Sequence, residues 1–139
     1  MSWENPSNEQ IKTLLEESET IAVIGLSDNP NRTSYQIAEA MQKSGYKIIP
    51  INPKIDEVLG EKSFNSLKDV NQSIDIINVF RRSEYLPDIA KEASEIKSKG
   101  FWAQQGVIHE EVPKILEENG TLVIMDLCIK VAHAVMLKK

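Results

Sequence analysis

The sequence predicts an α/β fold: a three-layer Rossmann-like domain whose five-stranded, mostly parallel sheet carries helices on both faces. The first observation is that apolar, β-branched segments alternate with amphipathic segments five times along the chain. The second is that these apolar segments are almost uninterrupted, which is typical of strands buried on both faces of a parallel sheet. The third is that a polar, turn-forming loop follows most of them. Strand, loop and helix therefore repeat as βαβ units, whose crossovers are right-handed.

The chain should begin with a helix and then a strand. Residues 8–18 carry apolar side chains at helical spacing, and Ser7 precedes them as the N-cap. Residues 20–26 form a continuous apolar run, which predicts a strand buried on both faces. The following loop, 27–32, is dense in residues that favour turns.

The second helix should follow this loop directly. Thr33 or Ser34 is expected to cap it, and Gly45 is expected to end it. Residues 46–51 then form a second buried strand. Pro53 marks the end of that strand, because proline cannot donate a hydrogen bond to a neighbouring strand.

The rest of the chain continues the alternation after a polar interval. Residues 54–73 are expected to hold at most one short helix, around Leu67, and residues 74–80 form the third strand. The remaining expected elements are a helix over 84–99 between Ser83 and Gly100, a strand over 101–104, a helix over 110–118, a strand over 121–126 and a helix over 129–137.

Length and composition suit one domain over residues 1–139, with the N-terminal helix in 1–18 packed on it. The formal net charge of -5 argues against binding to nucleic acid or a membrane surface, because both attract basic proteins. Cys128 is the single cysteine, so an internal disulfide and a multi-cysteine metal site are both excluded. We expect no metal site, and we expect the protein to lie in a reducing compartment, the cytoplasm.

Candidate ligand-binding residues follow the strands, because open parallel sheets bind ligands beyond the carboxyl ends of their strands. After the first strand these are Gly25, Leu26, Ser27 and Arg32. Gly25 can bring the backbone close to a ligand, and the next helix offers its N-terminus to an anion. Ser27 adds a hydroxyl and Arg32 a charged fork. The alternative is a capped turn with polar surface residues, since the full G-x-G-x-x-G pattern of dinucleotide sites is absent.

The end of the second strand distinguishes between nucleotide classes. A dinucleotide site usually has an acidic residue there to hold the ribose hydroxyls. This chain has Asn52, Pro53 and Lys54 instead. Lys54 favours a ligand with an additional phosphate, such as coenzyme A or NADP, over NAD. The alternative is an ordinary turn with a solvated lysine.

The third and fourth strands end in further candidates. Phe80 could face an adenine, and of the adjacent Arg81 and Arg82 we expect one to bind a phosphate and one to lie on the surface. The alternative is that both arginines are solvated beside nearby acidic residues. Gln104 or Gln105 could hydrogen-bond a base or the pantetheine amides, and their order leaves open which one faces the ligand.

Cys128 follows the fifth strand at the start of a helix, where a thiolate would be stabilised. A free cysteine is more often an inert buried residue, so both interpretations stay open. His109 fits a helix start, and His133 has no carboxylate at helical spacing to orient it. The sequence therefore predicts no catalytic residue and no Ser-His-Asp triad.

The chain resembles the small predicted CoA-binding proteins of bacteria and archaea. Their domain is similar to the N-terminal CoA-binding domain of the succinyl-CoA synthetase α subunit. The matching segments are Ala22–Pro30 with Arg32 and Ser34-Tyr35, Gly45–Pro53, Leu59–Glu61, Asp75–Glu84, Trp102–Val107 and Met125–Lys130. The resemblance implies that Gly25, Ser27 and Arg32 meet the phosphates of coenzyme A and that Asn52 and Pro53 flank its chain. It also implies that Phe80, Arg81 and Arg82 face the nucleotide, with Gln105 near it. It carries over binding, since the phosphorylated histidine of the synthetase lies in a separate domain.

These residues together favour a non-catalytic binding, carrier or sensor module for coenzyme A or an acyl-CoA over an enzyme. The alternative is an NAD(P)-binding redox sensor or small oxidoreductase, against which the missing acidic residue at Asn52 counts. A protein partner or a homodimer is compatible with either function.

Overall fold

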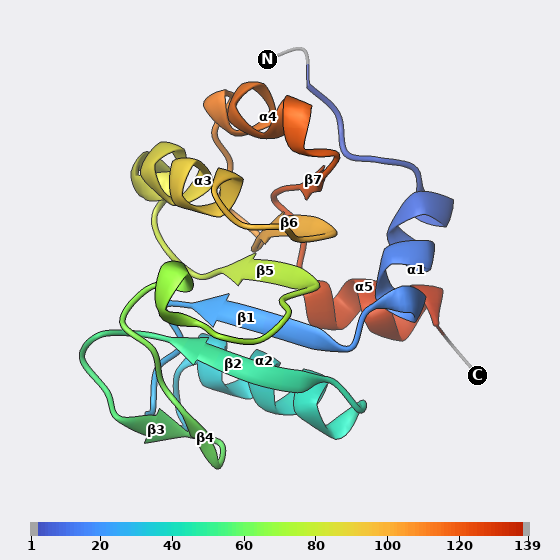
Figure 1. Cartoon of the computed structure of the whole chain (residues 1–139). Coiled ribbons are helices and arrows are strands. Elements are labelled where there is room, and N and C mark those ends of the chain that lie inside the picture. Colours follow the sequence, from blue (N-terminus) through green and yellow to red (C-terminus); the bar gives the residue numbers. More distant parts are fainter. Residues whose placement is uncertain (1–2, 138–139) are drawn as a thin grey trace.

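The computed structural model describes residues 3–137 and contains a five-stranded sheet in the order β2-β1-β5-β6-β7 (Figure 1). Each pair of neighbouring strands is parallel, which confirms the predicted Rossmann-like architecture. The strands are β1 (Thr20–Ile24), β2 (Lys47–Ile51), β5 (Ile76–Val79), β6 (Gly100–Ala103) and β7 (Leu122–Ile124).

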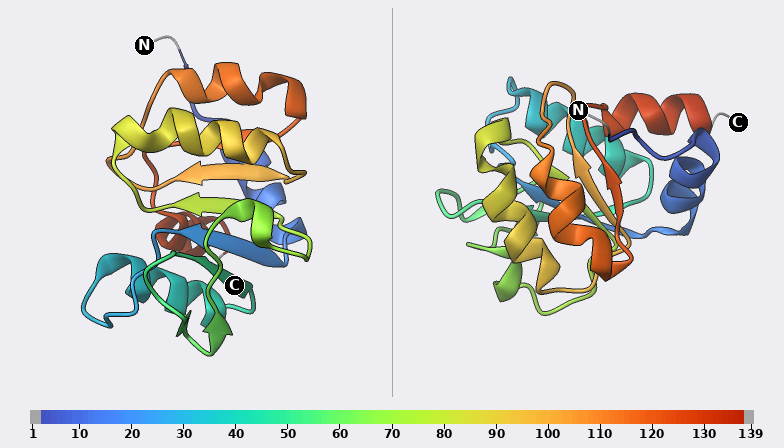
Figure 2. Two further views of the ribbon diagram at one scale, coloured as in Figure 1. Left: turned by 60° about the vertical axis from the view of Figure 1, so that its left-hand side comes forward. Right: turned by 90° about the horizontal axis from the view of Figure 1, so that it is seen from above.

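Helices cover both faces of this sheet, as predicted (Figure 2). One face carries α1 (Asn8–Glu17), α2 (Thr33–Lys43) and α5 (Ile129–Met136), and the other carries α3 (Leu86–Ser94) and α4 (Glu111–Leu116). Strand side chains alternate between the two resulting cores. In β1, Ile21 and Val23 join the first core, while Ala22 and Ile24 join the second. Both faces are buried, which explains why the strands are apolar throughout.

The helix α1 begins where the sequence predicts. The hydroxyl of Ser7 accepts from the backbone amide of Gln10, and the Gln10 side chain accepts from the backbone amide of Ser7. This reciprocal arrangement is a capping box, which satisfies two amides at the helix start. Gly45 directly follows the C-cap of α2 with φ +109°, which confirms it as the residue that ends that helix.

The polar interval contains a feature that sequence patterning did not predict. Besides a short 3-10 helix, η1 (Leu67–Asp69), it forms an antiparallel hairpin of β3 (Glu57–Val58) and β4 (Glu61–Lys62). The strands are too short to show alternation, and the turn residue Leu59 has φ 56°, a conformation that leucine rarely adopts. Phe64 then forms a parallel bridge to Ile51, so this segment covers the outer edge of β2.

The expected helix over 84–99 is shorter in the structure. A 3-10 turn, η2 (Ser83–Tyr85), precedes α3, and α3 ends at Ser94. Gly100 does not end a helix, because it is the first residue of β6. A Cβ atom on Gly100 would lie 2.6 Å from Cδ2 of Leu14, so its small size allows α1 to approach the sheet. The helix α4 similarly continues into a 3-10 turn, η3 (Glu117–Asn119).

The strand order places a topological switch between β1 and β5. From β1 the chain crosses to β2 on one side, whereas β5 leads to β6 and β7 on the other. The loops that leave β1 and β5 therefore lead to helices on opposite faces of the sheet, since α2 and α3 lie on different cores. A crevice between such loops is the general ligand-binding position of open α/β sheets.

Candidate functional site

The candidate site lies at the carboxyl ends of β1 and β5. The backbone amide of Phe80 donates to the carbonyl of Ile24 over 2.9 Å, and the amide of Gly25 donates to the carbonyl of Ile51 over 3.0 Å. These bonds extend the sheet by one residue and join the ends of three strands. The loops that follow, 25–32 and 80–82, therefore start from a fixed position.

Position 25 needs a glycine because the backbone of Phe80 lies too close for a side chain. The φ of Gly25 is +86°, and a Cβ atom there would lie 2.5 Å from the carbonyl oxygen of Phe80 and 3.2 Å from Nε of Arg81. The sequence predicts that Gly25 lets a ligand approach the backbone; in the structure, the atoms closest to this position are those of Phe80 and Arg81 on the loop after β5. The guanidinium of Arg81 consequently lies over the end of β1, at the switch point itself.

The loop 27–32 is ordered by its own short polar side chains. The amide of Ser27 donates to Oγ of Ser34, the amide of Asn29 to Oγ of Ser27, and the amide of Asn31 to Oδ1 of Asn29. The prediction that Thr33 or Ser34 caps α2 is wrong, because the N-cap is Arg32 and the Ser34 hydroxyl bonds the loop instead. These hydrogen bonds define the conformation of the loop.

The N-terminus of α2 keeps its capacity to bind an anion. Within the described chain no side chain caps this helix, whose N-cap Arg32 is exposed. Uncapped amides in a first helical turn point outward and carry partial positive charge. Arg32 adds a full charge at the same place. This arrangement suits a phosphate, whose oxygens accept from amides and guanidinium alike.

Asn52 has a structural role in this site. Its Nδ2 donates to the carbonyl of Leu26 over 2.9 Å, and its Oδ1 accepts from the amide of Lys54 over 3.0 Å. Its side chain therefore ties the end of β2 to the loop after β1, which leaves the exposed Pro53 and Lys54 as the surface at this point. The side chain of Leu26 lies in the core at 0% exposure, so only its backbone can take part in the candidate site.

The two arginines after β5 diverge. Arg81 lies against Gly25, whereas Nη1 of Arg82 lies 4.0 Å from Oε1 of Glu84, with both side chains largely exposed. Such a surface ion pair contributes little to stability. Phe80 is half-buried and packs against the core that α1, α2 and α5 cover, so its side chain already makes contacts within the protein.

The structure distinguishes the two glutamines. Gln104 is buried at 5% exposure, and its Oε1 accepts from Nδ2 of Asn78 and from the amide of Ile129. Gln105 is exposed in the loop after β6. Gln104 therefore anchors the start of α5 to the sheet, and Gln105 is the glutamine that a ligand can reach. The buried Asn78 was not among the expected polar positions, although a lone amide inside an apolar strand signals such a network.

The loops after β6 and β7 are tied together by Asp126. This residue has φ 59°, and its Oδ1 accepts from the amide of Gly106 over 2.7 Å. The indole Nε1 of Trp102 donates to the carbonyl of Leu127 over 2.8 Å. The half-buried Cys128 follows as the N-cap residue of α5. These contacts fix Cys128 at the carboxyl ends of the strands, where the loops that carry Arg32 and Arg81 also begin.

The histidines serve the fold. Nδ1 of His109 accepts from the amide of Glu111 at the start of α4, which confirms its expected role at a helix start. The ring of His133 meets that of Tyr46 edge to face, with centroids 5.6 Å apart. Among residues 3–137, no group of three His, Cys, Asp or Glu side chains is arranged to hold a metal ion. No helix in the same range is long and apolar enough to cross a membrane.

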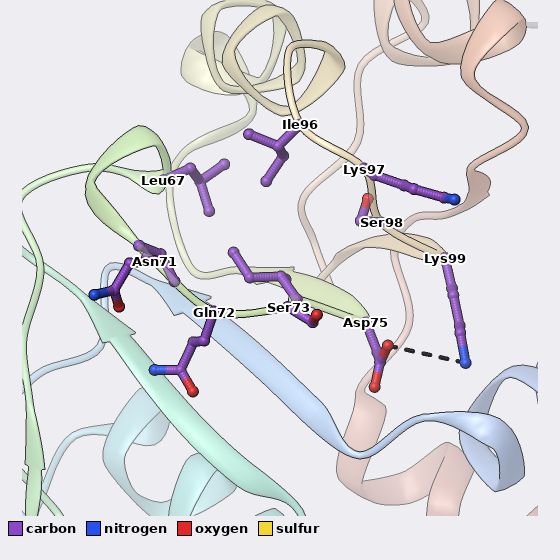
Figure 3. Close-up of a pocket in the computed structure, with 11 residues that line it drawn as sticks. Leu67, Asn71, Gln72, Ser73, Asp75, Ile96, Lys97, Ser98 and Lys99 are labelled. Carbon is purple, nitrogen blue, oxygen red and sulfur yellow. Dashed lines mark ion pairs between the residues drawn. The ribbon is translucent and has the colours of Figure 1, made fainter.

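A hollow of about 670 Å³ lies near the amino ends of β5 and β6, at the opposite ends of the strands from the candidate site (Figure 3). Leu67, Ile74 and Ile96 are among its apolar lining residues, and Asp75 and Lys99 form an ion pair of 3.9 Å at its side. Asp75 also accepts from the amides of Glu19 and Thr20. Its carboxylate therefore holds the amino end of β1, away from the candidate site.

Comparison with known families agrees with this geometry. A family model described as a CoA binding domain matches residues 19–134, which is most of the chain. A Bacillus subtilis protein, YneT, is 58% identical over 132 residues that cover 95% of this chain and 98% of the relative. The match confirms the resemblance predicted from the sequence motifs.

Enzymes and solved structures extend the comparison. The ADP-forming acetate–CoA ligase of Methanocaldococcus jannaschii is 32% identical over 81 residues, which are 58% of this chain but only 12% of the ligase. A Thermus thermophilus structure, cell-free ID.343, has 31% identity and TM-score 0.89, and covers 94% of this chain and 99% of that one. A hypothetical protein from Pyrococcus horikoshii has 26% identity and TM-score 0.90, with 99% of both chains covered.

Proposed function

Because this chain belongs to the family of CoA-binding domains, we propose that it binds coenzyme A or an acyl-CoA at the switch point between β1 and β5. The observation that supports the proposal is that three anion-binding features lie on the two loops that leave β1 and β5. They are the uncapped N-terminus of α2, the exposed Arg32, and the Arg81 guanidinium over Gly25. The binding unit in this proposal is the whole chain, residues 1–139.

The phosphates of coenzyme A match these features. Its diphosphate carries negative charge that first-turn amides and a guanidinium fork can share. Its separate 3′-phosphate is the group that Lys54, exposed after β2, would attract. We expect Ser27 and the backbone of Gly25 and Leu26 to border the ligand as well, because they belong to the loop that leads from β1 to Arg32 and because Asn52 bonds the Leu26 carbonyl. The net charge of -5 does not oppose this binding, because the local groups dominate over short distances.

The remainder of the ligand would extend toward β6 and β7. Gln105 offers an exposed amide for the pantetheine amides, and Cys128 lies at the far end of the same edge. Phe80 and Arg82, which follow β5, would border the start of this path, whereas Pro53, which follows β2, would border the phosphate side of the ligand. Gln104 would support this path, and Asn52 the phosphate side near β2, through hydrogen bonds that each already makes within the protein.

We propose a binding, carrier or sensor role without catalysis. The ligases that share this domain are much longer, and this chain matches 12% of the Methanocaldococcus jannaschii enzyme. Ligase chemistry is therefore not proposed for this chain. A protein partner or a second copy of the chain would receive the bound ligand or the signal.

The experiment is isothermal titration of the purified protein with coenzyme A, acetyl-CoA, NAD and NADPH. We expect saturable binding of coenzyme A with 1:1 stoichiometry and much weaker binding of both nicotinamide dinucleotides. The difference between coenzyme A and acetyl-CoA measures whether the thiol end is sensed. Binding of NAD or NADPH without coenzyme A would overturn the proposal and favour a redox sensor or oxidoreductase.

A further inference from the structure

A side chain near the N-terminus is bonded to the far edge of the sheet. Nδ2 of Asn5 donates to the carbonyl of Met125 over 2.9 Å, and the amide of Met125 donates to Oδ1 of Asn5 over 2.9 Å. Figure 1 shows the segment before α1 running past β7. A carboxamide has the donor and acceptor of a peptide group. Asn5 therefore pairs with Met125 as a neighbouring strand would.

Met125 directly follows β7 and begins the loop that leads to Cys128 in the candidate site. The pairing of β6 with β7 ends at Trp102 and Ile124, one residue earlier. Met125 is fully buried. The next residue, Asp126, has a left-handed backbone conformation, and its Oδ1 accepts from the amide of Gly106. The position of the Met125 backbone consequently sets the position of the loop from Asp126 to Cys128.

Asn5 is itself held from both sides. Trp3 is half-buried and packs on the core beside β7 and α4. On the other side, the capping box of Ser7 fixes the start of α1, whose residues Ile11 and Leu15 are buried in the opposite core. The segment 3–7 is thus anchored at two points, so its carboxamide is presented to Met125 in a defined position.

We propose that Asn5 is a positioning residue for the candidate site. It fixes the loop 125–128 and thereby tunes affinity for the thiol end of the ligand. The affinity part of this proposal rests on the proposed function. Asn5 lies outside residues 19–134, which the family model matches. The relation spans 120 positions of sequence and becomes visible only in the fold.

The reporter for the loop is the indole of Trp102, because its Nε1 donates to the carbonyl of Leu127. The chain has two tryptophans, so a Trp3→Phe background leaves Trp102 as the single indole while keeping an aromatic anchor. In this background the test variant is Asn5→Ala. The matched control is Asn8→Ala, the same substitution at an exposed position in the first turn of α1.

We expect Asn5→Ala to shift the Trp102 indole resonance and to weaken coenzyme A binding about threefold to tenfold, as loss of one or two modest hydrogen bonds implies. Asn8→Ala should change neither. If Asn5→Ala does not fold, Asn5→Asp, which keeps the acceptor and loses the donor, should show the same effects to a smaller degree.

An unchanged indole resonance in a folded Asn5 variant would overturn the proposal whatever the ligand does. A shifted resonance with unchanged affinity would refute the tuning of the ligand site. If the parent protein itself does not bind coenzyme A, the proposed function fails together with the tuning, whereas the resonance still decides whether Asn5 positions the loop.

Discussion

The Nε atom of Arg81 lies 3.2 Å from the position that a Cβ atom would take on Gly25. The guanidinium on the loop after β5 therefore covers the end of β1, and the two loops of the switch point are in direct contact. The closeness depends on the missing side chain, because the carbonyl oxygen of Phe80 would lie only 2.5 Å from the same Cβ position.

Gly25→Ala should destabilise the protein and displace Arg81. The residue would have to adopt φ +86° and push away the Phe80 carbonyl, which together should cost about 2–4 kcal/mol of unfolding free energy. Urea unfolding measures this. The control is Gly120→Ala, which has φ +70° but meets no described atom within 4 Å and should cost only the backbone part. Equal losses in both variants would show that the contact with Phe80 does not matter.

Gln104 and Gln105 should respond oppositely to substitution. Gln104→Leu leaves the amide of Ile129 without its acceptor and leaves Nδ2 of Asn78 with the carbonyl of Trp102 alone, so it should lower the unfolding free energy by about 1–3 kcal/mol. Gln105→Ala removes an exposed side chain and should change stability by less than about 0.5 kcal/mol. Paired urea melts and coenzyme A titrations separate the two roles. A stable Gln104→Leu variant would show that its network is dispensable.

Tyr46 should make stability fall in alkali. Burial raises the pKa of its phenol above the ordinary value of 10, and the nearby Glu16 carboxylate raises it further. The folded protein therefore retains a proton that the unfolded chain loses. The resulting stabilisation is fully present below about pH 10 and is lost as the pH rises through the raised value.

The test for Tyr46 is unfolding free energy as a function of pH in the parent and in Tyr46→Phe. The substitution should flatten the decline above pH 10, and it should lower stability at neutral pH because the carbonyl of Leu15 loses its 2.6 Å hydrogen bond. Tyr85→Phe, at an exposed tyrosine, serves as the control. An alkaline decline that is the same in all three proteins would exclude Tyr46 as its source.

The layer architecture could be predicted because the physics that selects it is local. Segments such as Ile21–Ile24 are apolar at every position, and only a strand with helices over both faces buries them. The hairpin at 57–62 escaped prediction because two-residue strands carry no period and because its turn uses Leu59 at positive φ. The sequence pattern predicts Gly100 as the end of a helix, whereas in the structure it begins β6 and its small size makes room for Leu14 of α1.

The sequence predicts the position of the candidate site more easily than the role of each residue in it. Polar residues after strands locate the edge, because parallel strands share one direction. Which of them stay accessible depends on partners far along the chain, as with Asn52 on Leu26 and Gln104 on Ile129. The bond of Asn5 to Met125 depends on the complete fold, so no local pattern could reveal it.

The most direct measurement of the central claim is coenzyme A titration of Arg81→Ala beside Arg82→Ala. The two arginines are adjacent and chemically identical, but Arg81 covers the switch point and Arg82 pairs with the exposed Glu84. If coenzyme A binds at the switch point, Arg81→Ala should weaken binding by about 1.5–3 kcal/mol, roughly tenfold to a hundredfold in Kd, while Arg82→Ala changes it little. Unchanged affinity in Arg81→Ala, with the parent protein binding coenzyme A, would contradict the account and move the phosphates away from this crevice.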